Sequence, residues 1–148
     1  MIAPEFVGKQ LDPVVLRVPR ERVVAFARAI GEEAAIHVDL DAARAAGFPD
    51  LVLPPTMLFG LELEIRGEEL LVDMGLDPLR VLHAEQSFTY HRSAHANEEL
   101  RFRTEVSDVY RRMNGRLEFI VQETTVHRAG EHLVDLRQVL VIEREESA

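Results

Sequence analysis

The residues best suited to acid–base chemistry lie in one short stretch in the first half of the chain. Glu32 follows the end of an expected helix, and His37 comes five residues after it. A carboxylate and an imidazole held in one loop can grip a water molecule, because the imidazole takes its proton while the acid orients it or shuttles the second proton. The spacing therefore indicates an acid–base pair that could add or remove water.

A second feature able to do chemistry follows at Pro54-Pro55-Thr56. The two prolines disfavour helix at the residues just before them, so a new helix is expected to begin at Thr56. A helix N-terminus presents free amides and the positive end of the helix dipole, which can polarise a thioester carbonyl. We therefore expect the Thr56 amide to bind a developing oxyanion.

Helices must position these groups. Apolar residues recur at helical spacing over residues 20–30, and an aspartate can cap a short helix over residues 42–46. The helix beginning at Thr56 is expected to run toward Leu70. Its apolar stripe, which we expect to be buried, consists of Met57, Leu58, Leu61 and Ile65.

The second half of the chain alternates between apolar and polar residues, which is typical of strands. Asn114-Gly115 predicts a two-residue hairpin turn, because both residues tolerate positive φ. Consecutive strands joined by short turns predict an antiparallel meander with one apolar helix on its inner face, an α+β arrangement. The expected strands are a short one at residues 14–18 and longer ones at residues 87–91, 100–109, 117–126 and 133–142.

Composition narrows the possible partners. A chain of 148 residues fits one domain, and its net charge of −9 argues against nucleic-acid or anionic-membrane partners, which need a basic footprint. The absence of cysteine excludes disulfides and a cysteine nucleophile. The first residues lack the features of a signal peptide, and no apolar stretch is long enough for a membrane span, so we expect a cytoplasmic protein.

The stretch around His37 resembles the signature of MaoC-type hydratases, Gly-Asp-x-Asn-Pro-(apolar)-His followed by an alanine-rich helix and Ala-Ala-Gly-Phe. Residues 81–92 resemble the first long strand in the N-terminal-type branch of that family, and the likeness covers nearly the whole chain. The positions that match in register are Gly31, Ile36, His37, Asp39, Ala42, Ala45, Ala46, Gly47 and Phe48.

The resemblance implies a single hot-dog domain over residues 1–148, an antiparallel sheet of about five strands wrapped around a central helix. It implies a hydro-lyase that reversibly hydrates 2-enoyl thioesters or dehydrates 3-hydroxyacyl thioesters, as in fatty acid metabolism. No cofactor is expected, because the substrate itself carries coenzyme A or acyl carrier protein. The expected assembly is a homodimer, or a heterodimer with a related hot-dog subunit.

The same resemblance assigns roles and shows departures. His37 takes the place of the catalytic histidine, and Glu32 that of the catalytic aspartate, with one extra methylene. The asparagine and proline of the family pattern are Ala34 and Ala35 here, and its His-Gly pair before the central helix is Pro55-Thr56. These departures keep open a non-catalytic subunit of a heterodimeric dehydratase. On that alternative, Glu32 is a solvated residue and His37 bridges loop backbone groups.

Further residues are assigned with less support from the pattern. We expect His83 and Arg92 to contact the substrate, the arginine because it suits the phosphates of a pantetheine carrier. No metal site is expected, since His91 and His95 have no third ligand nearby in the sequence. Some hot-dog thioesterases carry a catalytic carboxylate on the central helix, so Glu62 and Glu64 keep an acyl-CoA thioesterase as another alternative.

Overall fold

The computed structural model describes residues 2, 4–66 and 69–143. Among these residues no helix is long and apolar enough to cross a membrane. Short 3-10 helices occur at Pro4–Phe6, Ala35–His37, Pro78–Arg80 and Met113–Gly115. The other elements, in chain order, are β1 (Val14–Arg17), α1 (Arg20–Ala29), α2 (Leu40–Ala45), α3 (Met57–Arg66), α4 (Glu69–Asp73), β2 (Val81–Tyr90), β3 (Glu99–Arg112), β4 (Leu117–Arg128) and β5 (Glu131–Glu143).

The sheet has five antiparallel strands in the order β1-β3-β4-β5-β2, which confirms the expected α+β hot-dog class. The expected meander of four consecutive strands is wrong at its first member, because β2 lies beside β5 and not beside β3. Two strands therefore separate β2 from β3, a gap of roughly 14 Å. The connection over residues 91–98 is long enough to cross it, since each extended residue spans about 3.3 Å.

The expected two-residue turn at Asn114-Gly115 is also wrong in detail. The β3–β4 pairing ends at Arg112↔Leu117, which leaves the four residues 113–116 in the connection. Met113 and Asn114 have φ of 54° and 53°, and Gly115 has φ of 90°. The turn is at the expected place, but it uses one more positive-φ residue than a two-residue hairpin turn needs.

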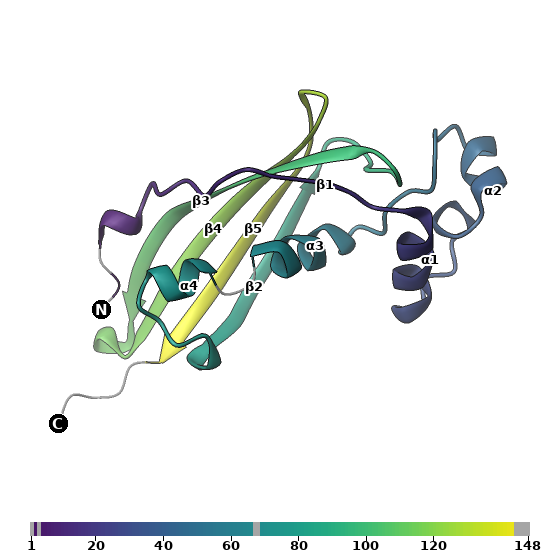
Figure 1. The fold of residues 1–148 in the computed structure, drawn as a ribbon. Helices are drawn as coiled ribbons and strands as arrows, with labels where there is room; N and C mark the ends of the chain where they lie inside the picture. The colour runs from purple at the N-terminus through teal and green to yellow at the C-terminus, as the bar shows by residue number, and fades with distance from the viewer. Residues whose placement is uncertain (1, 3, 67–68, 144–148) are drawn as a thin grey trace.

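The helix α3 lies along the inner face of the curved sheet, while α1 and α2 lie beyond one end of it (Figure 1). Leu58 and Leu61 of α3 are fully buried against the sheet, but Ile65 is 39% exposed and does not belong to the expected buried stripe. The expected long helix covers two described elements, α3, which is described as far as Arg66, and α4, which is described from Glu69, and residues 67–68 between them lie outside the described residues. The core residues from the sheet that share a cluster with α3 are Leu100, Phe102, Val126, Leu133, Val134 and Leu136.

An ion pair fastens the start of α1 to the segment that precedes α3. Two nitrogens of the Arg20 guanidinium, Nε and Nη2, each donate to one Asp50 carboxylate oxygen at 2.8 Å. Asp50 is buried and also accepts from the Leu51 amide and the Asn97 side chain. The Arg20 hydrogen bond, helped by these other donors, holds the pKa of Asp50 at about 2. Asp50 thus joins three separate segments while remaining charged.

We expect Asp50→Asn to lower the free energy of unfolding by about 1–2 kcal/mol at neutral pH, because charge-assisted hydrogen bonds are lost from a buried site. The lowered pKa means that this contribution is complete above pH ~4 and is lost as the pH falls toward about 2. Urea unfolding of both proteins over that range measures it.

The matched control is Glu99→Gln, which breaks the more exposed Arg17–Glu99 pair. Exposed pairs contribute little, so this change should stay within about 0.5 kcal/mol of the wild type. Equal losses in the two variants, or an Asp50→Asn difference that does not shrink at low pH, would contradict the role assigned to Asp50.

Candidate acyl-thioester site

One extended segment, Leu51–Leu53, positions both groups that the sequence marks for chemistry. The Val52 amide donates to the Ile36 carbonyl at 3.0 Å, next to His37. On its other side, the Leu53 amide donates to Ala94, and Leu51 accepts from Ala96. The segment leads directly into Pro54-Pro55 and α3. The His37 loop and the N-terminus of α3 are therefore fixed to the same piece of backbone.

The His37 ring is buried, with a fractional exposure of 6%. Its Nδ1 lies 2.6 Å from the Val52 carbonyl oxygen. A carbonyl can only accept, so Nδ1 carries the hydrogen and Nε2 of the neutral ring keeps its lone pair. The ring is thus oriented by the backbone in the tautomer that a general base requires.

The Glu32 carboxylate accepts a hydrogen bond from the Ala34 amide at 2.9 Å. The Ala34 carbonyl in turn accepts from the His37 amide at 3.1 Å. Within the described residues, no hydrogen bond or ion pair joins the Glu32 side chain to the His37 ring. The structure places both residues in one loop and uses the glutamate as a backbone cap, so their joint catalytic role stays a prediction.

The start of α3 leaves the Thr56 amide available. The Met57 amide donates to the Pro54 carbonyl at 2.9 Å, whereas no partner within the described residues accepts from the Thr56 amide. The Tyr90 hydroxyl donates to the Pro55 carbonyl, and burial raises the pKa of Tyr90 well above its usual range. Tyr90 thus stays a donor that fixes this corner, a role the sequence did not reveal.

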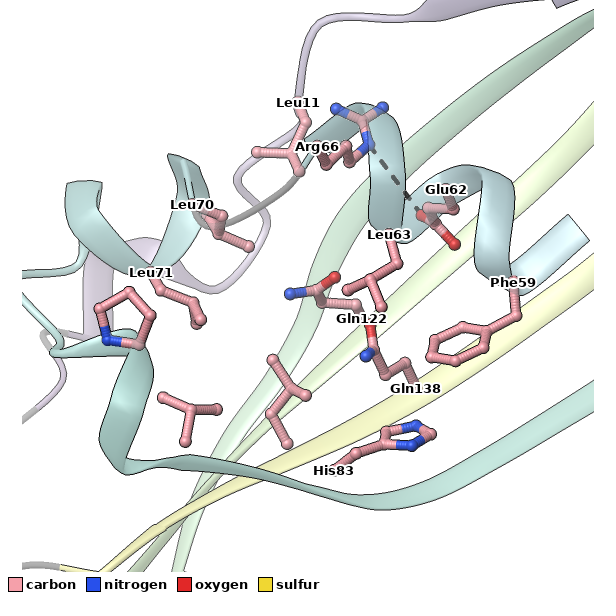
Figure 2. Close-up of a pocket in the computed structure, with 13 residues that line it drawn as sticks. Leu11, Phe59, Glu62, Leu63, Arg66, Leu70, Leu71, His83, Gln122 and Gln138 are labelled. Atoms are coloured by element: carbon pink, nitrogen blue, oxygen red, sulfur yellow. Dashed lines mark ion pairs between the residues drawn. The ribbon is translucent and has the colours of Figure 1, made fainter.

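A cavity of about 380 Å³ lies between α3, α4 and the inner face of the sheet (Figure 2). His83, expected to contact substrate, lines it and stacks on Phe59 with ring centroids 4.9 Å apart. Arg92 is exposed and does not line the cavity. Its Nε lies 3.4 Å from Oε1 of Glu131. The other lining residues are Leu11, Glu62, Leu63, Arg66, Leu70, Leu71, Pro78, Val81, Gln122, Gln138 and Leu140.

The two α3 carboxylates have different surroundings. Glu62 is buried and accepts from the hydroxyls of Thr104, at 2.8 Å, and Thr124. Its oxygen lies 4.0 Å from Nε of Arg66, the contact drawn in Figure 2. Glu64, by contrast, is exposed and pairs with Arg22. Glu62 therefore forms part of the polar wall of the cavity, while Glu64 faces solvent.

A cluster of His91, His132 and Asp135 forms away from the cavity. Nε2 of His91 and of His132 each lie 2.7 Å from an Asp135 carboxylate oxygen, and the three ligand atoms are within 4.8 Å of one another. His95 lies elsewhere and contacts Glu98 at 2.9 Å. The sequence did not reveal the cluster because Asp135 is 44 residues from His91.

The chain has clear relatives. A family model described as FAS1-like, dehydratase domain region, matches residues 5–136. A UPF0336 protein of Saccharopolyspora erythraea is 36% identical over 141 residues, covering 92% of this chain and 88% of the relative. The UPF0336 protein SCO4636 of Streptomyces coelicolor is 32% identical, covering 96% and 95%.

Solved structures give the same fold. The HadBC (3R-hydroxyacyl-ACP dehydratase) complex of Mycobacterium tuberculosis contains a chain that superposes with a TM-score of 0.80 at 22% identity, over 92% of this chain and 96% of that one. A MaoC-like dehydratase superposes with a TM-score of 0.81 at 26% identity, over 95% of this chain but 43% of that longer chain. The present chain therefore belongs to the FAS1-like dehydratase-region family and has the hot-dog fold of the MaoC-like dehydratases.

Proposed function

We propose that this chain is one subunit of a paired hydratase–dehydratase for acyl thioesters, in which it holds the acyl chain while a related hot-dog unit supplies the complete acid–base pair. The observation that carries the proposal is the placement of the Glu32 carboxylate, whose Oε1 accepts from the Ala34 amide of its own loop and which, within the described residues, makes no hydrogen bond or ion pair with the His37 ring. The cavity beneath α3 provides a largely apolar compartment for the acyl chain of the substrate.

Pairing is supported by the relatives and by the sheet edge. The neighbours at this fold include chains of two complexes, HadBC and ChsH1-ChsH2. The MaoC-like dehydratase chain is more than twice as long as the region matched here. Within the described residues, β2 pairs only with β5, so its other edge has ten residues open to a partner strand. A long open edge of this kind is normally covered.

The reaction needs a base and an acid around one water. In dehydration, the base removes a proton from the α-carbon while the acid protonates the hydroxyl that leaves the β-carbon, so one water departs and a double bond forms. Hydration reverses these steps. In this chain the Thr56 amide would steady the enolate oxygen of the thioester, since helix N-terminal donors suit a developing negative charge. His83 would contact the acyl chain at the cavity wall.

A self-sufficient hydratase is the second candidate, favoured by the orientation of His37. Its Nδ1 is fixed by Val52, which leaves Nε2 ready to accept a proton. Glu32 would then have to orient the water, either with its second carboxylate oxygen or after turning away from the Ala34 amide. The two candidates differ in what the isolated chain can catalyse.

We expect that, with the purified chain alone, the enoyl absorbance of crotonyl-CoA decreases no faster than in a buffer blank. No free thiol should be released. Activity should appear when a catalytic MaoC-type subunit is added. Hydration by the isolated chain that falls at least about 100-fold in His37→Ala would instead establish the second candidate. Thiol release would establish the thioesterase alternative, and Glu62→Gln would then be the variant to test.

Two substitutions of Glu32 distinguish a loop-capping role of this residue from a catalytic one. If Glu32 only caps the loop, Glu32→Asp and Glu32→Ala should leave the activity of the two-subunit enzyme within about twofold of wild type. If Glu32 is a displaced catalytic acid, Glu32→Asp should retain or raise activity, while Glu32→Ala should lower it by about 100-fold, because small displacements of a catalytic group have effects of that size. Steady-state rates with one enoyl thioester measure the difference.

Without its partner, two copies of the chain should associate through β2. Light scattering should then give a molar mass of twice 16.8 kDa. Leu82 is an exposed apolar residue of β2, and Leu82→Glu should give monomers, because it places a charge on the strand that the partner would cover. The control Met113→Glu alters an exposed apolar residue in the β3–β4 turn and should stay dimeric. A monomeric wild type at micromolar concentration would contradict the pairing.

A further inference from the structure

Three glutamines form a row on the inner face of the sheet. Gln122 of β4 is opposite Gln138 of β5, which is opposite Gln86 of β2. Directly paired residues of antiparallel strands share a face of the sheet. Thr124, two residues from Gln122 on β4, contacts Glu62 of α3, so this face is the one beneath α3. Gln122 and Gln138 line the cavity, and Gln86 continues the row beside it.

Several polar groups in this wall of the cavity or beside it have no hydrogen-bond partner in the described part of the protein. Gln122 is 9% exposed, and within the described residues neither its side chain nor that of Gln138 makes a hydrogen bond. Oε1 of Gln86 and Nε of Arg66 are buried, and no described residue bonds to either atom. Buried polar groups are nearly always hydrogen-bonded, so groups like these around a cavity indicate a polar ligand group or ordered water.

The remainder of the cavity is apolar. Its other side is built by Leu70 and Leu71 of α4, by Pro78, and by Val81 and Leu140 of the sheet. Figure 2 shows Gln122 and Gln138 reaching the space below Glu62 and Arg66, apart from Leu70 and Leu71. The cavity thus has a polar side and an apolar side, and its natural occupant has both kinds of surface.

We propose that this cavity selects acyl chains that carry an uncharged polar group, a hydroxyl or oxo group, several carbons beyond the thioester. The inference rests on the proposed function for the identity of the acyl chain. A plain hydrocarbon would cover the glutamine amides without replacing their hydrogen bonds to water, whereas a hydroxyl can both donate to them and accept from them.

The charges of the polar wall and its distance from Thr56 indicate which polar group of the acyl chain it would bind. The carboxylate of Glu62 and the guanidinium of Arg66 lie 4.0 Å apart and balance each other, so the wall offers no net charge for an ionised group. Glu62 is six residues beyond Thr56, which places the polar wall roughly 9 Å along α3 from the thioester-binding amide. The selected oxygen therefore lies well away from the reacting carbons.

Calorimetric titration with dodecanoate, ω-hydroxydodecanoate and dodecanedioate tests the proposal. The wild-type chain should bind the ω-hydroxy acid at least about fivefold more tightly than dodecanoate, the effect of one net hydrogen bond, and the diacid no more tightly than dodecanoate. The double variant Gln122→Leu/Gln138→Leu should lose or reverse this preference. Gln10→Leu, which changes an exposed glutamine, should keep it.

Wild-type preference for dodecanoate, binding of none of the three acids, or an unchanged preference in the double variant would overturn the proposal. Tighter binding of the diacid would show that the wall selects charge, and would overturn it as well. Thermal melts confirm that the double variant is folded. Because free acids contain no thioester, these results do not depend on hydration activity, so failure of the selectivity and failure of the proposed function are seen separately.

Discussion

The backbone of Leu51–Leu53 is the constraint on which the rest of the site depends. These three residues are hydrogen-bonded on both sides, to the loop that carries His37 and to residues 94–96. The Val52 carbonyl also fixes the His37 ring, and the preceding Asp50 fixes the start of α1. If this segment moved, the imidazole, the N-terminus of α3 and the cavity beneath it would all shift. The charged Asp50 therefore helps to position the His37 ring and the N-terminus of α3, although it belongs to neither.

The fold could be predicted largely because its signals are local. Alternation over residues 100–142 marks three strands, and the prolines before Thr56 mark where α3 begins. The neighbours of a strand in the sheet are not a local property. Nothing in residues 81–90 shows that β2 pairs with β5, because that pairing depends on how the 91–98 connection crosses the end of the sheet.

The site was predictable only where a motif covers it. His37 lies in the register that the pattern indicates and is buried and oriented. The hydrogen bond of Glu32 to Ala34 could not be inferred, since a glutamate in a loop can turn either way. The sequence alone does not indicate the glutamine row, because each glutamine is an ordinary residue of its own strand. Polar residues at inward-facing positions of an alternating strand were the available signal, and they become a group only once the register is known.

The strand order has a consequence for how the chain reaches its native state. The last strand, β5, lies between β4 and β2, so β2 has no partner within its own chain until residues 131–143 have been synthesised. Until then one side of α3 lacks the wall formed by β5. The β3–β4 hairpin can form early, whereas closure of the sheet around α3 waits for the final strand and joins segments about fifty residues apart. The interior of this domain is therefore shielded from water only after β5 has been synthesised.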